Sequence, residues 1–330
     1  MNILSASIVL TGLMAATAVQ ASCGSSACSI NTNWDEHSVG IPGWTAELRY
    51  SYSKADQLRQ GSHKIAADTT ADGEVENLGT VNKIVTSVLD YTHDDHWGIT
   101  LQLPYVTREH EHNLGPYTGA DAAGYEKFHA SALGDVKLIG RYRWAYDEVS
   151  SIGVKFGLKL NTGRKDFLLV DNSGATKLPS EVTLQPGNGS TDLIVGAFWQ
   201  QATPGGNWNW FAQTTLQKAI HSDASFRPGR QFNIDGGTRY AISHNLSGLL
   251  QVNAQWIAQD SGDAAAPSAF STVPGSATGG KTFSLTPGLS YAFTPKLQLY
   301  GLVQLPLYQY VNGEQLTAKT SLTLGVSHRL

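Results

Sequence analysis

Apolar and polar residues alternate with a period of two along the last fifty residues of the chain. In the segment 281–293, Phe283 and Leu285 fall on one face, and Ser284 and Thr286 fall on the other. A strand of this kind has one face in an apolar medium and one in a polar medium. Each strand of a soluble sandwich gives the same pattern, so one segment does not distinguish a sandwich from a membrane barrel. The repetition and spacing of the pattern along the chain make that distinction.

The alternation recurs from residue 43 to the end of the chain. The segments that show it are 43–53, 83–93, 97–107, 132–146, 151–161, 190–201, 207–218, 231–243, 247–258, 281–293, 297–310 and 318–330. Each is about ten residues or longer, which is the length that a tilted strand needs to cross a bilayer. The connections after the odd segments are mostly long, and those after the even segments are short. Such a meander places its long loops at one end, as bacterial outer-membrane barrels do.

The apolar faces of the segments 43–53, 151–161 and 190–201 carry no charge, as a lipid-facing surface requires. Ile152, Val154 and Phe156 line one of them, and aromatic residues such as Trp97 and Trp144 gather near the short turns. Aromatic belts of this kind mark the membrane interface. The sequence therefore predicts an all-β fold over residues 43–330: a single antiparallel up-and-down transmembrane β-barrel of about 12 strands in a Gram-negative outer membrane.

Composition and the N-terminus agree with export to that membrane. The chain has 330 residues, 15% of them charged, and a net charge of −4, which does not indicate a nucleic-acid partner. No apolar run after residue 21 reaches the roughly 18 to 20 residues of a membrane helix. Residues 1–21 contain an apolar run that ends in Val19-Gln20-Ala21 and are expected to be a signal peptide. Residues 22–42 are then expected to form a periplasmic segment.

Both cysteines of the chain, Cys23 and Cys28, lie in that segment. An even cysteine count in an exported chain is most simply explained by a disulfide. The alternatives are a redox or thiolate metal site and, for Cys23, lipidation. We predict the disulfide, because two cysteines without a nearby histidine make a poor metal site.

A glycine-rich run resembles a known family. Residues 184–193 contain Pro186-Gly187-Asn188-Gly189-Ser190-Thr191-Asp192, and Gly134-Asp135-Val136 and Gly325-Val326-Ser327 fit the same pattern. The run is similar to the outer-membrane channel-like barrels of the MetA-pathway phenol-degradation type, over roughly residues 130 to 330. The resemblance implies an outer-membrane barrel with a role in solute passage. The terminal Leu330 departs from the usual final Phe of such barrels.

The inward faces hold the candidate functional residues. Charged residues with inward parity, expected in the lumen, are Glu47, Lys137, Arg141, Arg143, Lys155, Lys159, Asp235 and Arg239. Five cations from two neighbouring segments form a ladder that would attract anions, because pore charges set selectivity. The alternative is that these cations pair with Glu47, Asp135, Asp192 and Asp235 and fill a narrow barrel.

The histidines give weaker signals. His93 and His96 lie in a short turn, and His110 and His112 begin an expected long loop. Imidazole and carboxylate groups at such spacings can bind Zn(II), Cu(II) or Ni(II), but without a third fixed ligand we predict solvated segments and no metal or cofactor. His244 and Ser247 are three apart in a short turn, the wrong geometry for a hydrolase pair, so we expect no enzyme.

The predicted function is passage of a small solute, an anionic or aromatic organic acid, through a polar and partly basic lumen. The alternative is a closed barrel that binds a metal or a partner through its loops or its periplasmic cysteine segment. Outer-membrane lipid and a small solute are the expected partners. The sequence leaves the oligomeric state open.

Overall fold

The computed structural model describes residues 42–66, 74–114, 125–171, 174, 177–223, 226–262 and 278–330. Its strands are β1 (Gly43–Gly61), β2 (His63–Lys64), β3 (Glu74–Thr92), β4 (Trp97–Leu114), β5 (Tyr125–Leu133), β6 (Lys137–Ala145), β7 (Ser150–Lys159), β8 (Leu168–Asp171), β9 (Lys177–Pro179), β10 (Ser190–Ala202), β11 (Trp208–Ser222), β12 (Gln231–Ala241), β13 (Leu246–Ile257), β14 (Gly280–Ala292) and β15 (Leu297–Arg329). One short 3₁₀ helix, η2, spans Val182–Leu184. No helix among these residues is long and apolar enough to cross a membrane.

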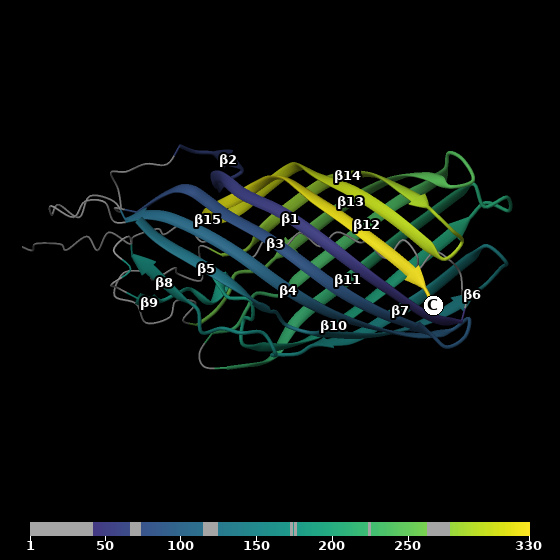
Figure 1. The fold of residues 1–330 in the computed structure, drawn as a ribbon, viewed down its shortest axis with the longest axis horizontal. Helices are drawn as coiled ribbons and strands as arrows, with labels where there is room; N and C mark the ends of the chain where they lie inside the picture. The colour runs from purple at the N-terminus through teal and green to yellow at the C-terminus, as the bar shows by residue number, and fades with distance from the viewer. Residues whose placement is uncertain are drawn as a thin grey trace, which may run out of the picture.

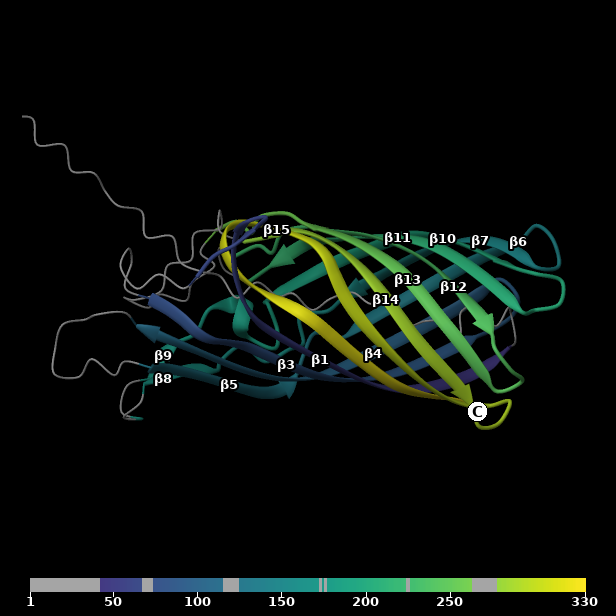
Figure 2. The ribbon, with the colours of Figure 1, turned by 90° about the horizontal axis from the view of Figure 1, so that it is seen from above.

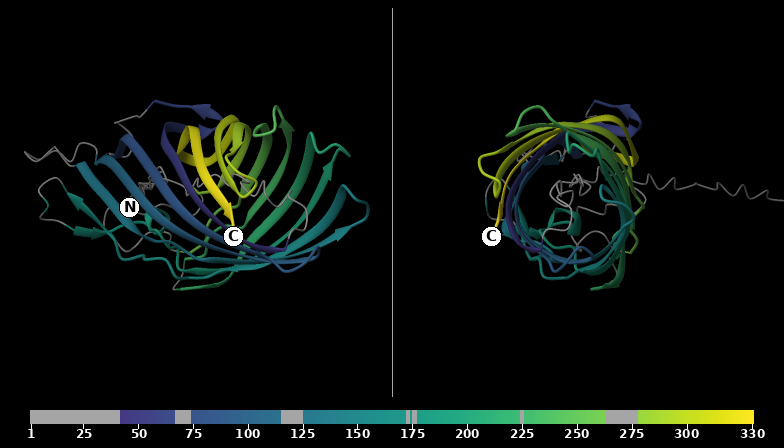
Figure 3. Two further views of the ribbon diagram at one scale, coloured as in Figure 1. Left: turned by 45° about the vertical axis from the view of Figure 1, so that its right-hand side comes forward. Right: turned by 90° about the vertical axis from the view of Figure 1, so that its right-hand side faces the viewer.

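The strands close into a barrel. Antiparallel pairing runs β1–β3–β4–β6–β7–β10–β11–β12–β13–β14–β15, and β15 returns to β1. Figure 3 shows the closed ring in the view along the barrel, and Figure 1 shows the inclined strands. Among the described residues eleven labelled strands form this ring, while β2, β5, β8 and β9 extend one end of it. The expected all-β antiparallel barrel is therefore confirmed.

The last strand accounts for the difference between eleven labelled strands and the twelve expected segments. The first part of β15 pairs with β14 up to Val311, and the remainder pairs with β1 from Val311 to Arg329. Gly313 lies between the two parts in the left-handed region, at φ 65°, which favours glycine. The two halves lie side by side, since the Gln309 amide donates to the Ala318 carbonyl oxygen at 3.0 Å. β15 thus covers both of the last two predicted segments.

The outer surface is apolar and the inner surface is polar, as the alternation predicts. Leu48, Phe156 and Leu289 on the outer face are half exposed, whereas Gln251 and Thr286 on the inner face are completely buried. The short turns and the C-terminus share one end of the barrel (Figure 2), and exposed aromatic residues such as Trp97, Trp144 and Trp208 lie beside these turns. Trp44 and Tyr91, for example, stack at 4.7 Å between ring centroids. Short periplasmic turns and an interfacial aromatic belt place this end at the inner side of an outer membrane.

Three strands continue beyond the expected limits. Residues 54–82 and 108–131 were expected as loops, but β1 continues to Gly61, β3 starts at Glu74 and β4 reaches Leu114. The wall around β3, β4 and β5 is therefore taller at the loop end (Figure 1). Here cross-strand ion pairs replace apolar contacts, for example Lys83 with Glu109 at 3.0 Å. Outside lipid the outer face needs no apolar residues, so the hydropathy pattern stops before the strands do.

The expected strand 132–146 is interrupted. β5 ends at Leu133 and β6 begins at Lys137, with Asp135 between them. At this break, side-chain oxygens accept backbone N–H groups that a neighbouring strand would otherwise bind. The Asp135 carboxylate accepts the backbone N–H of Gly163 at 3.0 Å, and the Thr162 hydroxyl accepts that of Val136 at 2.9 Å. The break lets the chain between β7 and β10 pack against the inside of the wall.

Candidate functional site in the polar lumen

A buried ion cluster lies where β7 and β10 meet inside the barrel. The Lys159 amine donates to the Asp135 carboxylate at 2.8 Å and lies 3.6 Å from Asp192. It also donates to the Asn188 side chain and the Ser190 carbonyl oxygen, both at 2.7 Å. Lys159 is 4% exposed, so its charge is enclosed by these partners. The glycine-rich run 186–192 thus supplies three of the residues that surround the buried Lys159 amine.

A second network joins side chains of five strands, β7, β11, β12, β13 and β14. The Lys155 amine donates to the Gln213 amide oxygen at 3.1 Å, and the Gln213 amide nitrogen donates to Asp235 at 2.9 Å. The Asn253 amide donates to the other oxygen of Asp235 at 2.6 Å, and the Thr286 hydroxyl donates to Asn253 at 2.8 Å. Buried polar side chains are stable only when their donors and acceptors have hydrogen-bond partners, as they do here. Lys155 and Asp235 are therefore parts of one chain of hydrogen bonds.

Arg141 has a partner that the sequence analysis did not identify. Its guanidinium donates to both oxygens of Asp90 on β3, at 2.5 and 2.9 Å, and to the Thr92 hydroxyl at 2.6 Å. Bidentate pairing of this kind is the strong form of an arginine–carboxylate contact. Gly98 on β4 leaves room for it, because a Cβ there would lie 2.3 Å from the guanidinium carbon.

Lys137 differs from these cations. It begins β6 and is only half buried, and its amine donates to the Gln217 amide oxygen at 3.3 Å. Among the residues that the structure describes, Lys137 forms no ion pair with a carboxylate. Gln217 donates in turn to Asp192 at 2.6 Å. The amine therefore faces the lumen with a long hydrogen bond to a neutral amide, which an anion could displace.

The remaining predicted lumen residues lie toward the short-turn end. The Arg143 guanidinium donates to the Asp95 carbonyl oxygen at 3.1 Å, and Arg239 donates to the Ser247 hydroxyl at 3.1 Å. The Glu47 carboxylate pairs with Arg49 at 2.7 Å and accepts the Tyr300 hydroxyl at 2.5 Å. Arg143, Arg239 and Glu47 thus each have a different partner.

Apolar side chains also face the lumen. Phe211, Leu249, Tyr300 and Leu302 form one buried cluster inside the wall. Glycines opposite make room for them: a Cβ at Gly237 would lie 2.6 Å from the Phe211 ring. The Lys155 amine lies 5.4 Å above the centre of the Phe198 ring. Apolar surface and fixed cations therefore occur in the same lumen.

Arg108 is a lumen residue that sequence analysis missed. It is 7% exposed on β4 and donates to Asn82 at 2.6 Å and to the Thr183 carbonyl oxygen at 2.7 Å. This contact holds the η2 segment inside the outer half of the barrel. Its position in the expected loop 108–131 concealed it, although it shares inward parity with Val106 on β4.

The histidines fall in two environments. His110 lies within β4, not in a loop, and its side chain is buried with Nδ1 at 3.0 Å from the Thr80 hydroxyl. His112 also belongs to β4, which corrects the expected loop. His93 and His96 lie in the turn after β3, where Asp94 accepts the N–H groups of His96 and Trp97 at 2.8 Å. No group of three metal-ligating side chains occurs in the described ranges.

The predicted signal peptide, the segment 22–42 and the Cys23–Cys28 disulfide lie outside those ranges.

One protein family and several solved structures resemble this chain. The family described as "Putative MetA-pathway of phenol degradation" matches residues 60–324. The chain belongs to this family. No curated protein sequence matches the chain.

Solved structures of outer-membrane proteins have a similar fold. The COG4313 outer membrane channel from Pseudomonas putida F1 superposes with a TM-score of 0.60 at 15% identity, covering 90% of this chain and 98% of that one. The translocator domain of the autotransporter NalP from Neisseria meningitidis gives 0.48 at 10% identity, covering 90% and 91%. A Pseudomonas aeruginosa FadL homologue gives 0.44 at 9% identity, covering 88% and 91%. The family match and the barrel fold are those of a channel-like β-barrel of the outer membrane.

Proposed function

We propose that the barrel carries a small anionic organic solute across the outer membrane and that Lys137 is the cation the solute meets. The observation that supports this is the set of groups that the Lys137 amine contacts. Lys137 faces the lumen and contacts a neutral amide at 3.3 Å, whereas Lys159 and Arg141 contact carboxylates. A charge of this kind attracts anions without first losing an ion pair.

The apolar lumen residues favour an aromatic acid among such solutes. Phe198 lies beneath the Lys155 amine, and the cluster around Phe211 and Leu302 follows inside the wall. A carboxylate would contact Lys137, and the aromatic ring would contact these side chains at a later point of the passage, because Lys137 pairs with Lys159 and Phe198 pairs with Gly153 farther along β7. This supports the predicted preference for carboxylated aromatic solutes over neutral polar ones.

A flux assay tests this function. Liposomes that contain the full-length protein should take up benzoate faster than the neutral benzamide, and Lys137→Gln should remove most of that difference. Lys296→Gln, an exposed lysine in the turn before β15, is the matched control. Equal uptake of the two solutes by the wild type would contradict the proposal.

The closed-barrel alternative has one observation in its favour. Gln251, Ser284 and Thr286 face inward and are completely buried. If liposomes with correctly folded protein take up neither solute, the closed barrel replaces the channel.

A further inference from the structure

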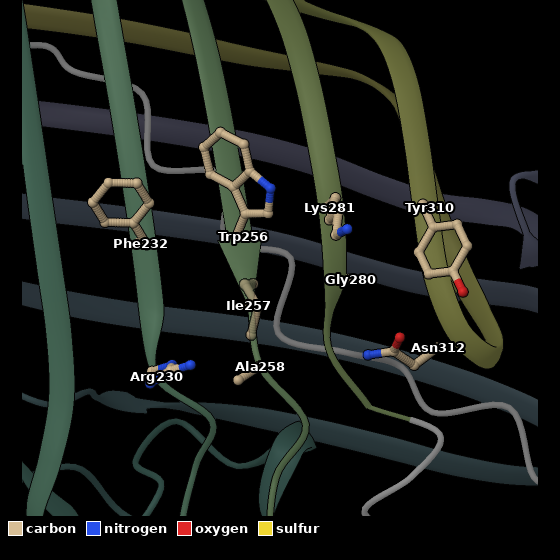
Figure 4. A pocket seen from close by; sticks show the side chains of 9 residues that line it. All are labelled: Arg230, Phe232, Trp256, Ile257, Ala258, Gly280, Lys281, Tyr310 and Asn312. Atoms are coloured by element: carbon tan, nitrogen blue, oxygen red, sulfur yellow. The ribbon is translucent and has the colours of Figure 1, made fainter.

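A cationic groove lies on the outer surface of the barrel near the loop end. It is about 210 Å³ in volume and is formed by β12, β13, β14 and β15. Four residues from these strands stand side by side: Phe232 pairs with Trp256, Trp256 with Lys281, and Lys281 with Tyr310. Figure 4 shows these side chains together with Arg230, which lies just beyond Phe232 toward the loops.

Lys281 and Arg230 bring two positive charges to this part of the outer surface. Most outward positions of the strands are apolar or aromatic, and Lys218 on β11 is another exposed cation among them. A cation on the lipid face is tolerated only near the interface. Lys281 follows the first residue of β14, and Arg230 immediately precedes β12, so both lie at the outer membrane boundary. The aromatic residues beside them mark the same level. The two cations are therefore at the depth of the outer-leaflet headgroups.

Neither cation is neutralised by a carboxylate of the residues that the structure describes. Among the described residues, no ion pair joins Arg230 or Lys281 to a carboxylate, and both are exposed. The nearest aromatic contact of Lys281 is with Tyr310, whose ring centre lies 5.9 Å from the amine. Asp260 accepts the backbone N–H of Gly229 at 2.6 Å, and it lines two neighbouring pockets, one of which Lys281 also borders, without an ion pair to either cation. The groove thus combines two available positive charges with an aromatic floor.

We propose that this groove binds a phosphorylated glycolipid of the outer leaflet, with the lipid phosphate on Arg230 and Lys281. An acyl chain would lie against Phe232 and Trp256, which pack at 5.7 Å between ring centroids. Guanidinium and ammonium groups form charge-assisted hydrogen bonds with phosphate oxygens. The exposed rings supply the apolar contact that a free phosphate ion would not use. Charge and apolar surface together select an amphiphile.

The test uses the full-length protein in detergent, with diphosphorylated lipid A as the probe and native mass spectrometry as the measurement. We expect one tightly held lipid A per chain. The double variant R230Q/K281Q should bind it at least about tenfold more weakly, as the loss of charge-assisted contacts predicts. K296Q removes an exposed lysine at the opposite rim and should bind lipid A as the wild type does.

Urea unfolding separates a loss of lipid binding from a loss of folding. The double variant should unfold in urea at the same midpoint as the wild type, because both side chains are exposed and form no ion pair. The single variants R230Q and K281Q cover the case in which the double variant does not fold. Equal retention of lipid A by the folded variants would overturn the proposal. Displacement of lipid A by millimolar inorganic phosphate, or equal binding of dioleoylphosphatidylcholine, would overturn it as well.

Discussion

Each lumen cation is defined by the groups around it. Lys159 is enclosed by two carboxylates, Arg141 is held by both oxygens of Asp90, and Lys137 contacts a neutral amide. Removing a cation that holds a carboxylate leaves that carboxylate buried without its partner, which is costly. Removing Lys137 leaves only an amide oxygen, so its charge can be changed with little effect on the fold.

Arg141→Gln should therefore destabilise the barrel by about 2 to 3 kcal/mol, because Asp90 loses its bidentate partner. Urea unfolding in lipid vesicles measures the free energy of unfolding. Adding Asp90→Asn should recover much of the loss, and Lys137→Gln alone should cost less than about 1 kcal/mol. Equal losses for R141Q and K137Q would contradict this view of the lumen.

Asp94, in the turn after β3, gives a pH-dependent prediction. The backbone N–H groups of Trp97 and His96 donate to its carboxylate and hold the pKa of Asp94 below its usual range. A lowered pKa in the folded state stabilises the protein above the unfolded pKa, about 3.9, and this contribution is lost as the pH falls through the folded pKa. Asp94→Asn should lower stability at pH 7, and the difference from the wild type should shrink below about pH 4.

The control for this pH dependence is Glu148→Gln in the next short turn. The Glu148 side chain forms no hydrogen bond within the described part of the chain. Its substitution should leave the pH profile of stability unchanged. A difference between wild type and D94N that stays constant from pH 7 to pH 3 would show that the carboxylate charge does not stabilise the turn.

The strands differ in how well the sequence predicted them. Across the bilayer the alternation located every strand, because lipid on one face and lumen on the other impose a period of two. Beyond the bilayer, β4 continues to Leu114 through His110, where polar residues stand on both faces. The break at Asp135 was also not predicted, because it depends on Gly163, Thr162 and Asn188, which follow β7 in the sequence.

The candidate site was predictable only in part. Lys137 and Arg141 on β6 pair in register with Lys159 and Lys155 on β7, so these four residues share one parity on neighbouring strands. Their partners could not be predicted, since Asp90 is 51 residues from Arg141 and the register across β3, β4 and β6 decides the contact. The Gln213 and Gln217 amides, which accept hydrogen bonds from Lys155 and Lys137, lie on β11, and the sequence does not indicate which lysine each one contacts.

The glycine-rich segment before β10 is held by a close backbone approach. A Cβ at Gly187 would lie 2.5 Å from the Gly163 carbonyl oxygen. Gly187→Ala should push the two backbones apart and disturb the Lys159 cluster, at a cost of about 1 to 3 kcal/mol. The free energy of unfolding in urea should show the loss. Gly205→Ala, in an exposed turn where a Cβ would meet only the Asn207 amide at 4.0 Å, should be neutral. Equal effects would contradict the argument.

The molecule as a whole combines a closed wall with an unevenly charged interior. β1 pairs with β3 on one side and β15 on the other, so no edge in the ring is left unpaired in lipid. The short turns and the C-terminus share one end, and the taller wall and η2 lie at the other. Within this frame, a solute that enters from the loop end passes η2 before it reaches the lysines of the middle section.

Ion selectivity of the reconstituted protein tests the central claim most directly. In a planar bilayer with a KCl gradient, the wild type should give a reversal potential on the chloride side of zero, because the Lys137 amine contacts a neutral amide and forms no ion pair with a carboxylate among the described residues. Lys137→Gln should move that potential toward cation selectivity, while Lys296→Gln should leave it unchanged. A cation-selective wild type, a folded protein that conducts nothing, or a reversal potential that does not respond to K137Q would contradict the account.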